Sequence, residues 1–186
     1  MVQLSRDPRQ IETTVANFLA HEDQITFISN DIKGDLRLID YNPLDPVSEG
    51  GEKLIRTTEF HKGSEATCTL LLVKPSVRPS SQLLIGHTNG SISCLLPLDE
   101  NIYKPLQLLQ GALIRQIPHH AALNPRAHRF VRNDYVSRSL SKGVLDGLLL
   151  VAFEMLSSKC QFEIAKRIGH TKPELLDALR LCNWSL

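Results

Sequence analysis

The chain has 186 residues, of which 42% are hydrophobic and 22% charged, the proportions of a globular protein with room for one ordinary domain or two small ones. Its longest apolar run, Leu148 to Phe153, is too short to span a bilayer, and its first residues lack the apolar stretch of a secretory signal. The four cysteines are scattered without a Cys-x-x-Cys pair, which argues against a zinc cluster or a thioredoxin-like motif and favours a reducing intracellular compartment.

Strands are expected throughout the first half of the chain. Residues 24–29 alternate polar and apolar side chains, which is typical of a half-buried strand. Further apolar runs are separated by stretches rich in Gly, Pro and Asn, which block a strand. The pattern predicts strands at 24–29, 36–41, 53–60, 66–74, 82–87 and 91–96.

Thr88-Asn89-Gly90 lies between the last two of these segments and predicts a hairpin with a type I′ turn. Antiparallel strands of this length and spacing suit a sandwich, a barrel or the blades of a β-propeller. We therefore expect residues 1–98 to form a β domain.

The period of the apolar residues changes near Asp99. One helical face is formed by Ile102, Leu106, Leu109, Leu113 and Ile117. Asp99 or Asn101 can cap this helix, Pro105 falls in or at the edge of its first turn, and Pro118 ends it.

Three more helical segments are expected further along the chain. Residues 144–156 are apolar nearly all round, which predicts a buried helix. Ser158 with Gln161 and Thr171 with Glu174 form capping boxes that would begin the two helices behind it. Residues 99–186 are therefore expected to form a helical domain.

Catalytic and metal-binding motifs are absent from the sequence. His119 and His120, with His128, form the only histidine cluster, but neighbouring loop side chains converge poorly on one metal and no carboxylate lies at ligand spacing. There is no G-x-S-x-G, P-loop or G-x-G-x-x-G motif. The carboxylates of the first half are expected in turns, without the apolar surroundings of a catalytic acid. We therefore expect a non-enzymatic protein without a cofactor or a metal.

The charge is unevenly distributed, although the net charge is only +1. Residues 1–100 carry 9 Lys/Arg and 14 Asp/Glu, a balance of −5, whereas residues 101–186 carry 12 Lys/Arg and 6 Asp/Glu, a balance of +6. The basic excess is concentrated within residues 115–142. It can serve an acidic partner or a nucleic-acid backbone, or it can be a solvated face opposite the acidic half.

Arginines in this basic segment are candidate RNA contacts. Guanidinium groups bind phosphates in a bidentate manner, and Phe130 could stack on a base or, alternatively, anchor the segment in the core. The candidate partner or RNA contacts are Arg126, Arg129, Arg132, His119, His120 and Asn124.

Several segments resemble one family in the same order along the chain. They are residues 95–98, 103–110, 118–127, 144–149 and 164–171. These segments resemble the C-terminal region of the large subunit of the cleavage and polyadenylation specificity factor, a family shared with the large subunit of the damaged-DNA-binding complex and a splicing factor 3b subunit. The His-His-x-x-Leu-Asn-Pro-Arg segment at 119–126 separates the polyadenylation branch from the damaged-DNA-binding relative.

The resemblance implies a fold and a function. It implies the terminal blades of an incomplete β-propeller, then a small helical domain, in a nuclear, non-enzymatic scaffold for pre-mRNA 3′-end processing. The implied partners are a WD-repeat subunit and a CCCH zinc-finger subunit that read the polyadenylation signal, so contact with pre-mRNA can be indirect. A ubiquitin-ligase adaptor of the damaged-DNA-binding type is the alternative. Because open blades leave unpaired strand edges, the isolated chain is expected to aggregate or to need further chain segments.

Overall fold

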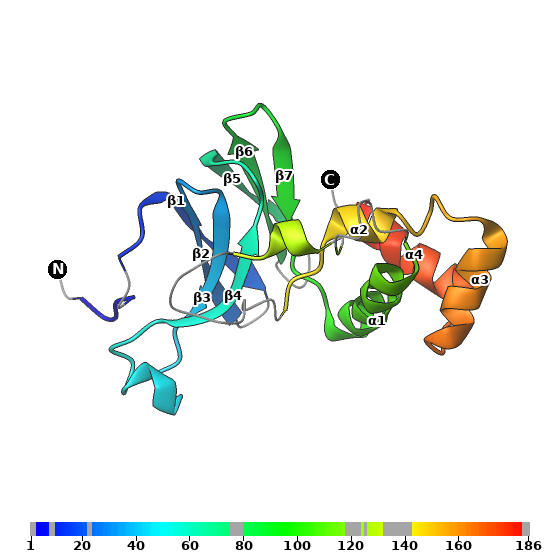
Figure 1. Ribbon diagram of the computed structural model, residues 1–186. Helices are drawn as coiled ribbons and strands as arrows, with labels where there is room; N and C mark the ends of the chain where they lie inside the picture. Colours follow the sequence, from blue (N-terminus) through cyan, green and yellow to red (C-terminus); the bar gives the residue numbers. More distant parts are fainter. Residues whose placement is uncertain are drawn as a thin grey trace. The chain divides into compact units, whose positions relative to one another are not determined.

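The computed structural model describes residues 3–7, 10–21, 24–74, 80–117, 124, 126–131 and 143–183. Within these ranges, seven strands precede four α-helices, which confirms the expected order of β and then α (Figure 1). The chain forms two compact units. One comprises residues 1–97 and 128–144, and the other comprises residues 98–127 and 145–186, so the segment from His128 belongs to the strand unit although it follows the first helix.

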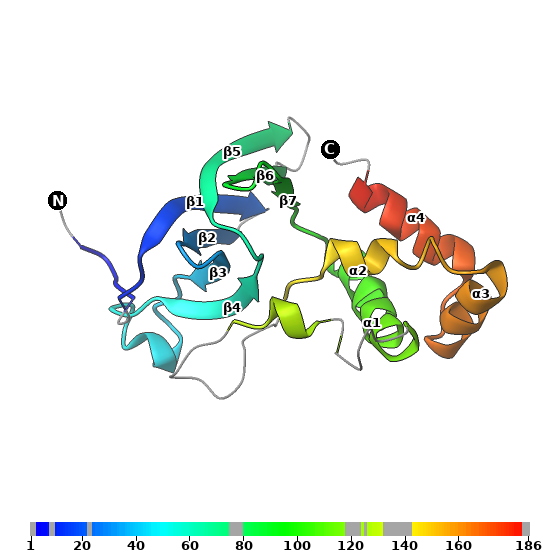
Figure 2. The same cartoon turned by 45° about the horizontal axis from the view of Figure 1, so that its top comes forward.

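The strand unit contains two sets of antiparallel strands (Figure 2). The first set runs in the order β4-β3-β2-β1, with β1 at Thr13–His21, β2 at Gln24–Asp31, β3 at Asp35–Asp40 and β4 at Ile55–His61. The second set places β6, Ser80–His87, between β5, Ala66–Lys74, and β7, Ile92–Leu95. A single pair, His21 opposite Ser80, joins β1 to β6. The described strands do not close into a ring.

Strand β1 is absent from the sequence-based expectation. It pairs along its length with β2, where Phe18 lies opposite Phe27 and Leu19 opposite Thr26. Apolar residues occur at both odd and even positions of this strand, so both of its faces carry them and the period-2 signal disappears. The pairing with β2 therefore reveals a strand that alternation does not.

The hairpin between β6 and β7 forms where Asn-Gly predicts it, but its turn is of another type. A type I′ turn needs positive φ at two residues, whereas in this loop only Gly90 has a positive φ, of 80°. The side chain of Asn89 stabilises this turn, because its Oδ1 accepts hydrogen bonds from the backbone N–H (3.0 Å) and the hydroxyl (2.6 Å) of Ser91.

The core of the strand unit lies between the two sets of strands. Direct pairing places Ile28 beside Leu38 in the first set and Leu83 between Leu71 and Leu95 in the second. Buried apolar side chains from both sets form one cluster. Its fully buried members are Ile28, Leu36, Ala66, Leu83 and Ile85. One face of each set is therefore buried against the other set.

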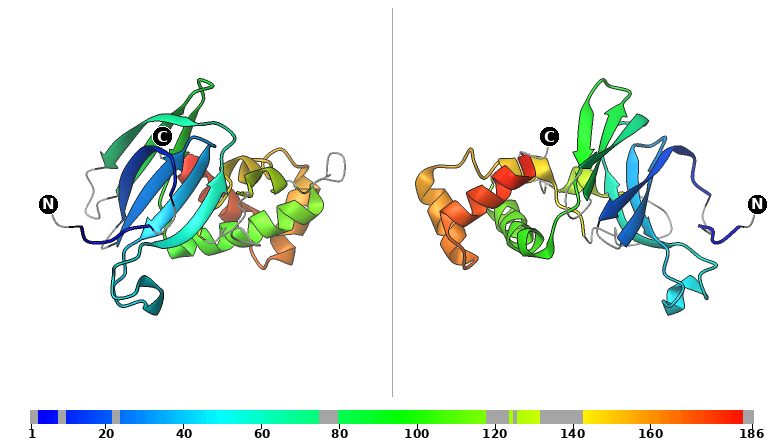
Figure 3. Two further views of the ribbon diagram at one scale, coloured as in Figure 1. Left: turned by 60° about the vertical axis from the view of Figure 1, so that its left-hand side comes forward. Right: turned by 180° about the vertical axis from the view of Figure 1, so that it is seen from behind.

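The helical unit is built from α1, Glu100–Gln116, α2, Gly147–Val151, α3, Ser158–Arg167, and α4, Lys172–Asn183 (Figure 3). The apolar face expected for α1 is buried at Leu106, Leu109 and Leu113. Residues from all four helices complete this core. They include Leu150, Phe153, Ile164, Leu175 and Leu179.

Two expectations for the helices are wrong in detail. The segment expected as one buried helix is a short α2 followed by turns, and its residues Leu148 and Met155 are 75% and 85% exposed. The cap of α3 is Ser157, whose hydroxyl accepts from Cys160 N–H, and not Ser158. Gln161 instead donates to the carbonyl oxygen of Phe153 at 2.8 Å, because it is buried under the preceding turns.

The capping box of α4 is confirmed. The Thr171 N–H donates to Glu174 Oε2 at 3.0 Å, and the Glu174 N–H donates to Thr171 Oγ1 at 3.4 Å. Pro105 is the sixth residue of α1, one turn later than the tolerated first turn, and α1 continues through it.

Candidate functional site

The expected contact residues Asn124 and Arg126 form a local turn. The Asn124 side chain is exposed, and its Oδ1 accepts from the Arg126 N–H at 2.8 Å, while its carbonyl oxygen accepts from the Ala127 N–H. This Asx turn precedes the 3₁₀ helix Ala127–Arg129. Asn124 thus has a structural role in shaping the segment that carries Arg126.

Arg129 packs against β4 of the strand unit. Its guanidinium carbon lies 5.0 Å from the centroid of the Phe60 ring. Its Nη1 donates to the carbonyl oxygens of His61 and Lys62, both at 3.5 Å. The guanidinium therefore holds the end of β4, and a charge reversal at Arg129 would disturb this packing as well as any phosphate contact.

The candidates His119, His120 and Arg132 lie outside the described residues. Arg126 belongs to the helical unit and Arg129 to the strand unit. Direct RNA binding by the three arginines stays a prediction, and Arg126 is the described position that tests it with least damage to the fold.

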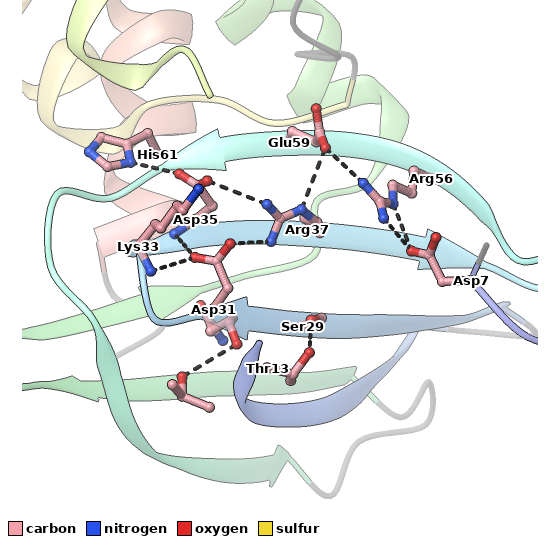
Figure 4. A network of polar contacts seen from close by, with 12 residues as sticks. Asp7, Thr13, Ser29, Asp31, Lys33, Asp35, Arg37, Arg56, Glu59 and His61 are labelled. Carbon is pink, nitrogen blue, oxygen red and sulfur yellow. Dashed lines mark hydrogen bonds and ion pairs between the residues drawn. The ribbon is translucent and has the colours of Figure 1, made fainter. Parts of the chain in front are cut away.

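A network of charged side chains lies on the face of the first strand set that points away from the core (Figure 4). Arg37 is at its centre, and its Nη1 lies 2.7 Å from Asp31 Oδ2. Its Nη2 lies 3.4 Å from Asp35 Oδ2, and its Nε lies 3.5 Å from Glu59 Oε1. All four side chains are at most 7% exposed.

Arg56 extends this network to the start of the chain. Its Nη1 is 3.2 Å from Glu59 Oε1, and its Nη2 is 2.6 Å from Asp7 Oδ2. The neighbouring Arg6 pairs with Lys53 in a parallel bridge. The segment around Asp7 is therefore attached beside β4 by backbone pairing and by a charge pair.

His61 ends the network at the other side, where its Nδ1 lies 2.7 Å from Asp35 Oδ1. The expectation that the carboxylates of the first half sit in solvated turns is thus wrong for Asp31, Asp35 and Glu59. Pairing with arginines offsets the cost of burying them. Ion pairing gives this network a structural role.

A second polar cluster joins three elements of the strand unit. Lys62 follows β4, His87 ends β6 and Ser93 lies in β7. The Lys62 Nζ donates to Ser93 Oγ at 3.3 Å, and His87 Nε2 lies 2.8 Å from the same oxygen. The Ser93 hydroxyl therefore bridges the amine and the imidazole.

Burial changes the protonation of both basic groups. It lowers the pKa of Lys62 to about 8, because the charged form loses hydration. Burial also lowers the pKa of His87, and repulsion from the Lys62 charge lowers it further. Backbone hydrogen bonds to Ser64 and Glu65 partly oppose this lowering. The amine of Lys62 is thus unusually easy to deprotonate.

Apolar side chains are exposed on the outward face of the first strand set. Phe18 and Phe27 lie opposite each other on β1 and β2, and are 49% and 42% exposed. Ile25, two residues before Phe27, shares this face and is 58% exposed.

The outward face of the second set has the same character. Leu70 lies opposite Leu84, and Ile92 lies opposite Gly86 on the same side. Leu70 and Ile92 are 58% and 75% exposed. Both sets of strands therefore expose large apolar side chains on the face that points away from the core, and in the first set these lie beside the charge network.

Within the described ranges, no group of three or more His, Cys, Asp or Glu side chains is placed to bind a metal ion. None of the described helices combines the length and the apolar character that crossing a membrane requires.

The sequence was compared with protein families and with curated proteins. Residues 1–155 match the family model described as the CPSF A subunit region. This chain belongs to that family. The resemblance seen in the sequence to a cleavage and polyadenylation specificity factor large-subunit region is thereby confirmed.

The similar proteins of the CPSF A subunit region family are much longer than this chain. The probable cleavage and polyadenylation specificity factor subunit 1 of Oryza sativa is 32% identical over 93% of this chain and 13% of its own length. Protein cft1 of Aspergillus oryzae is 30% identical over 94% of this chain and 14% of its length. Protein cft1 of Schizosaccharomyces pombe is 25% identical over 91% of this chain and 12% of its length. The chain thus spans about an eighth of these relatives.

Proposed function

We propose that this chain acts as part of a non-enzymatic, nuclear scaffold of the pre-mRNA 3′-end cleavage and polyadenylation machinery. The name of the rice relative supports a polyadenylation factor over a ubiquitin-ligase adaptor. Scaffold proteins present recognition surfaces on a rigid framework. Two strand sets that enclose a buried apolar core provide such a framework.

The observation that carries the proposal is the group of large apolar side chains exposed on each outward face. One outward face exposes Phe18 and Phe27, and the other exposes Leu70 and Ile92. Groups of large exposed apolar side chains usually mark surfaces that another protein segment covers. In a β-propeller each blade is covered on both faces by its neighbours. We infer that the two strand sets are consecutive blades, and that further blades cover the two exposed faces.

Thiol reactivity tests the blade arrangement. An Ile25→Cys variant of the 186-residue chain should react with a maleimide, whereas a cysteine at the matching position of a full-length relative should be protected. Leu44→Cys is the control, because Leu44 is 91% exposed in the loop between β3 and β4 and should react in both cases. Equal labelling of the cysteine at position 25 and of the cysteine at its matching position would contradict stacked blades.

Co-purification tests the scaffold role. The proposed partners are a WD-repeat subunit and a CCCH zinc-finger subunit, and a full-length relative such as the rice protein should recover both. A version that lacks the region of this chain should lose one or both partners. Undiminished recovery of both partners without this region would contradict the proposal.

A further inference from the structure

The cluster of Lys62, Ser93 and His87 has the composition of a reactive site and does not belong to the charge network on the first strand set. The Lys62 amine donates to Ser93 Oγ, and His87 Nε2 lies 2.8 Å from the same oxygen, so the Ser93 hydroxyl can donate to His87 when its Nε2 is unprotonated. His87 is 7% exposed, and Lys62 keeps part of its surface in solvent.

The surroundings of Lys62 do not favour a fixed positive charge. Among the described residues, no carboxylate forms an ion pair with Lys62, and its amine donates to the neutral Ser93 hydroxyl. His87 lies on the same hydroxyl, and the Arg129 guanidinium lies on the backbone carbonyl of Lys62. His61, the preceding residue, is paired with Asp35, and Glu65 lies in the following turn. Burial next to other basic groups disfavours the ammonium form.

We propose that Lys62 is a nucleophilic lysine that accepts an acyl group from a thioester, with Ser93 and His87 removing the proton that its amine releases. The Lys62 nitrogen attacks the thioester carbonyl, the new C–N bond forms and the C–S bond breaks. The proton leaves the nitrogen through the Ser93 hydroxyl to His87 Nε2 and then reaches the departing thiolate or the solvent. The products are an amide at Lys62 and a free thiol.

The state of each group suits this step. At pH 7.4 an amine with a pKa of about 8 is roughly one-fifth neutral, whereas an ordinary lysine is neutral about one time in a thousand. A depressed pKa by burial is one of the ways in which proteins activate a lysine. The lowered pKa of His87 keeps its imidazole neutral near pH 7, so that it can accept a proton.

The test measures acetylation of the intact protein by S-acetyl-N-acetylcysteamine, a small uncharged thioester, with mass spectrometry at each lysine. Lys104 is the internal control, because its side chain is 66% exposed and pairs with the equally exposed Glu100. At pH 7.4, Lys62 should react at least tenfold faster than Lys104. Its rate should level off above about pH 8, whereas the rate at Lys104 should rise well beyond that pH.

Two variants test the proton path. Ser93→Ala and His87→Gln should each lower the rate at Lys62 several-fold on the plateau, while the rate at the exposed Lys104 stays unchanged. Hydrogen exchange of peptides from the strand unit, unchanged in both variants, reports that this unit is still folded. Acetylation of Lys62 no faster than that of Lys104 would overturn the proposal. A Lys62 rate that neither variant changes would overturn it as well.

Discussion

Replacing Arg37 by methionine should destabilise the strand unit strongly. Methionine keeps the apolar stem of the side chain but removes the guanidinium that faces Asp31, Asp35 and Glu59. Glu59 keeps its contact with Arg56, whereas Asp31 loses the arginine at 2.7 Å. Breaking a buried ion pair by removing one partner costs about 3–5 kcal/mol, and this value applies because all four side chains are nearly inaccessible.

Equilibrium urea denaturation measures this loss. With a slope of about 1–3 kcal/mol per molar urea, the midpoint should fall by roughly 1–5 M. Hydrogen exchange of peptides from residues 31–61 should accelerate more than exchange in the helical unit, because the network lies within the first strand set.

Arg180→Met is the matched control. Arg180 forms an ion pair with Asp177, but the two side chains are 66% and 69% exposed, so its removal should change the free energy of unfolding by about 0.5 kcal/mol or less. The double variant Arg37→Met/Asp31→Asn should recover part of the loss, because one unpaired charge is gone. A loss below about 1 kcal/mol for Arg37→Met would refute the reasoning from burial.

Three further predictions address the helical core, the turns and pH. Leu113→Ala should cost about 2–5 kcal/mol in thermal or urea unfolding because Leu113 is fully buried, whereas Leu108→Ala, at a position 51% exposed, should cost much less. Gly34→Ala should destabilise the fold by about 1 kcal/mol or more, because Gly34 has a φ of 80° and an added Cβ would lie 2.8 Å from a backbone oxygen. Gly111→Ala should stabilise it by about 0.5–1 kcal/mol, because Gly111 lies inside α1 and an added Cβ would meet open space. Lys62 binds a proton less readily in the folded than in the unfolded state, so the free energy of unfolding should rise between about pH 8 and 10.5. Urea midpoints measured across this range should show the rise in the unaltered protein, and a Lys62→Met variant should lose it.

Local patterns predicted the elements whose signals are carried by neighbouring residues. The alternation in β2, the apolar face of α1 and the box of Thr171 and Glu174 depend on spacings of two to four residues, and each is present in the structure. The same reasoning placed the cap of α3 one residue late, because Gln161 lies three residues after Ser158 and matches a capping box that the structure does not form. Packing of Gln161 under the preceding turn decided between Ser157 and Ser158 as the cap.

The sequence alone established a β-rich first half, a helical second half and membership of a family through residues that keep their order along the chain. Tertiary structure decided which polar residues are buried and which apolar residues are exposed. Arg37 meets Glu59 only through the register of β3 with β4, and Ser93 meets Lys62 only because β7 returns beside the end of β4. Such contacts join residues 22 and 31 positions apart, so their energies depend on strand pairing, which no local pattern encodes.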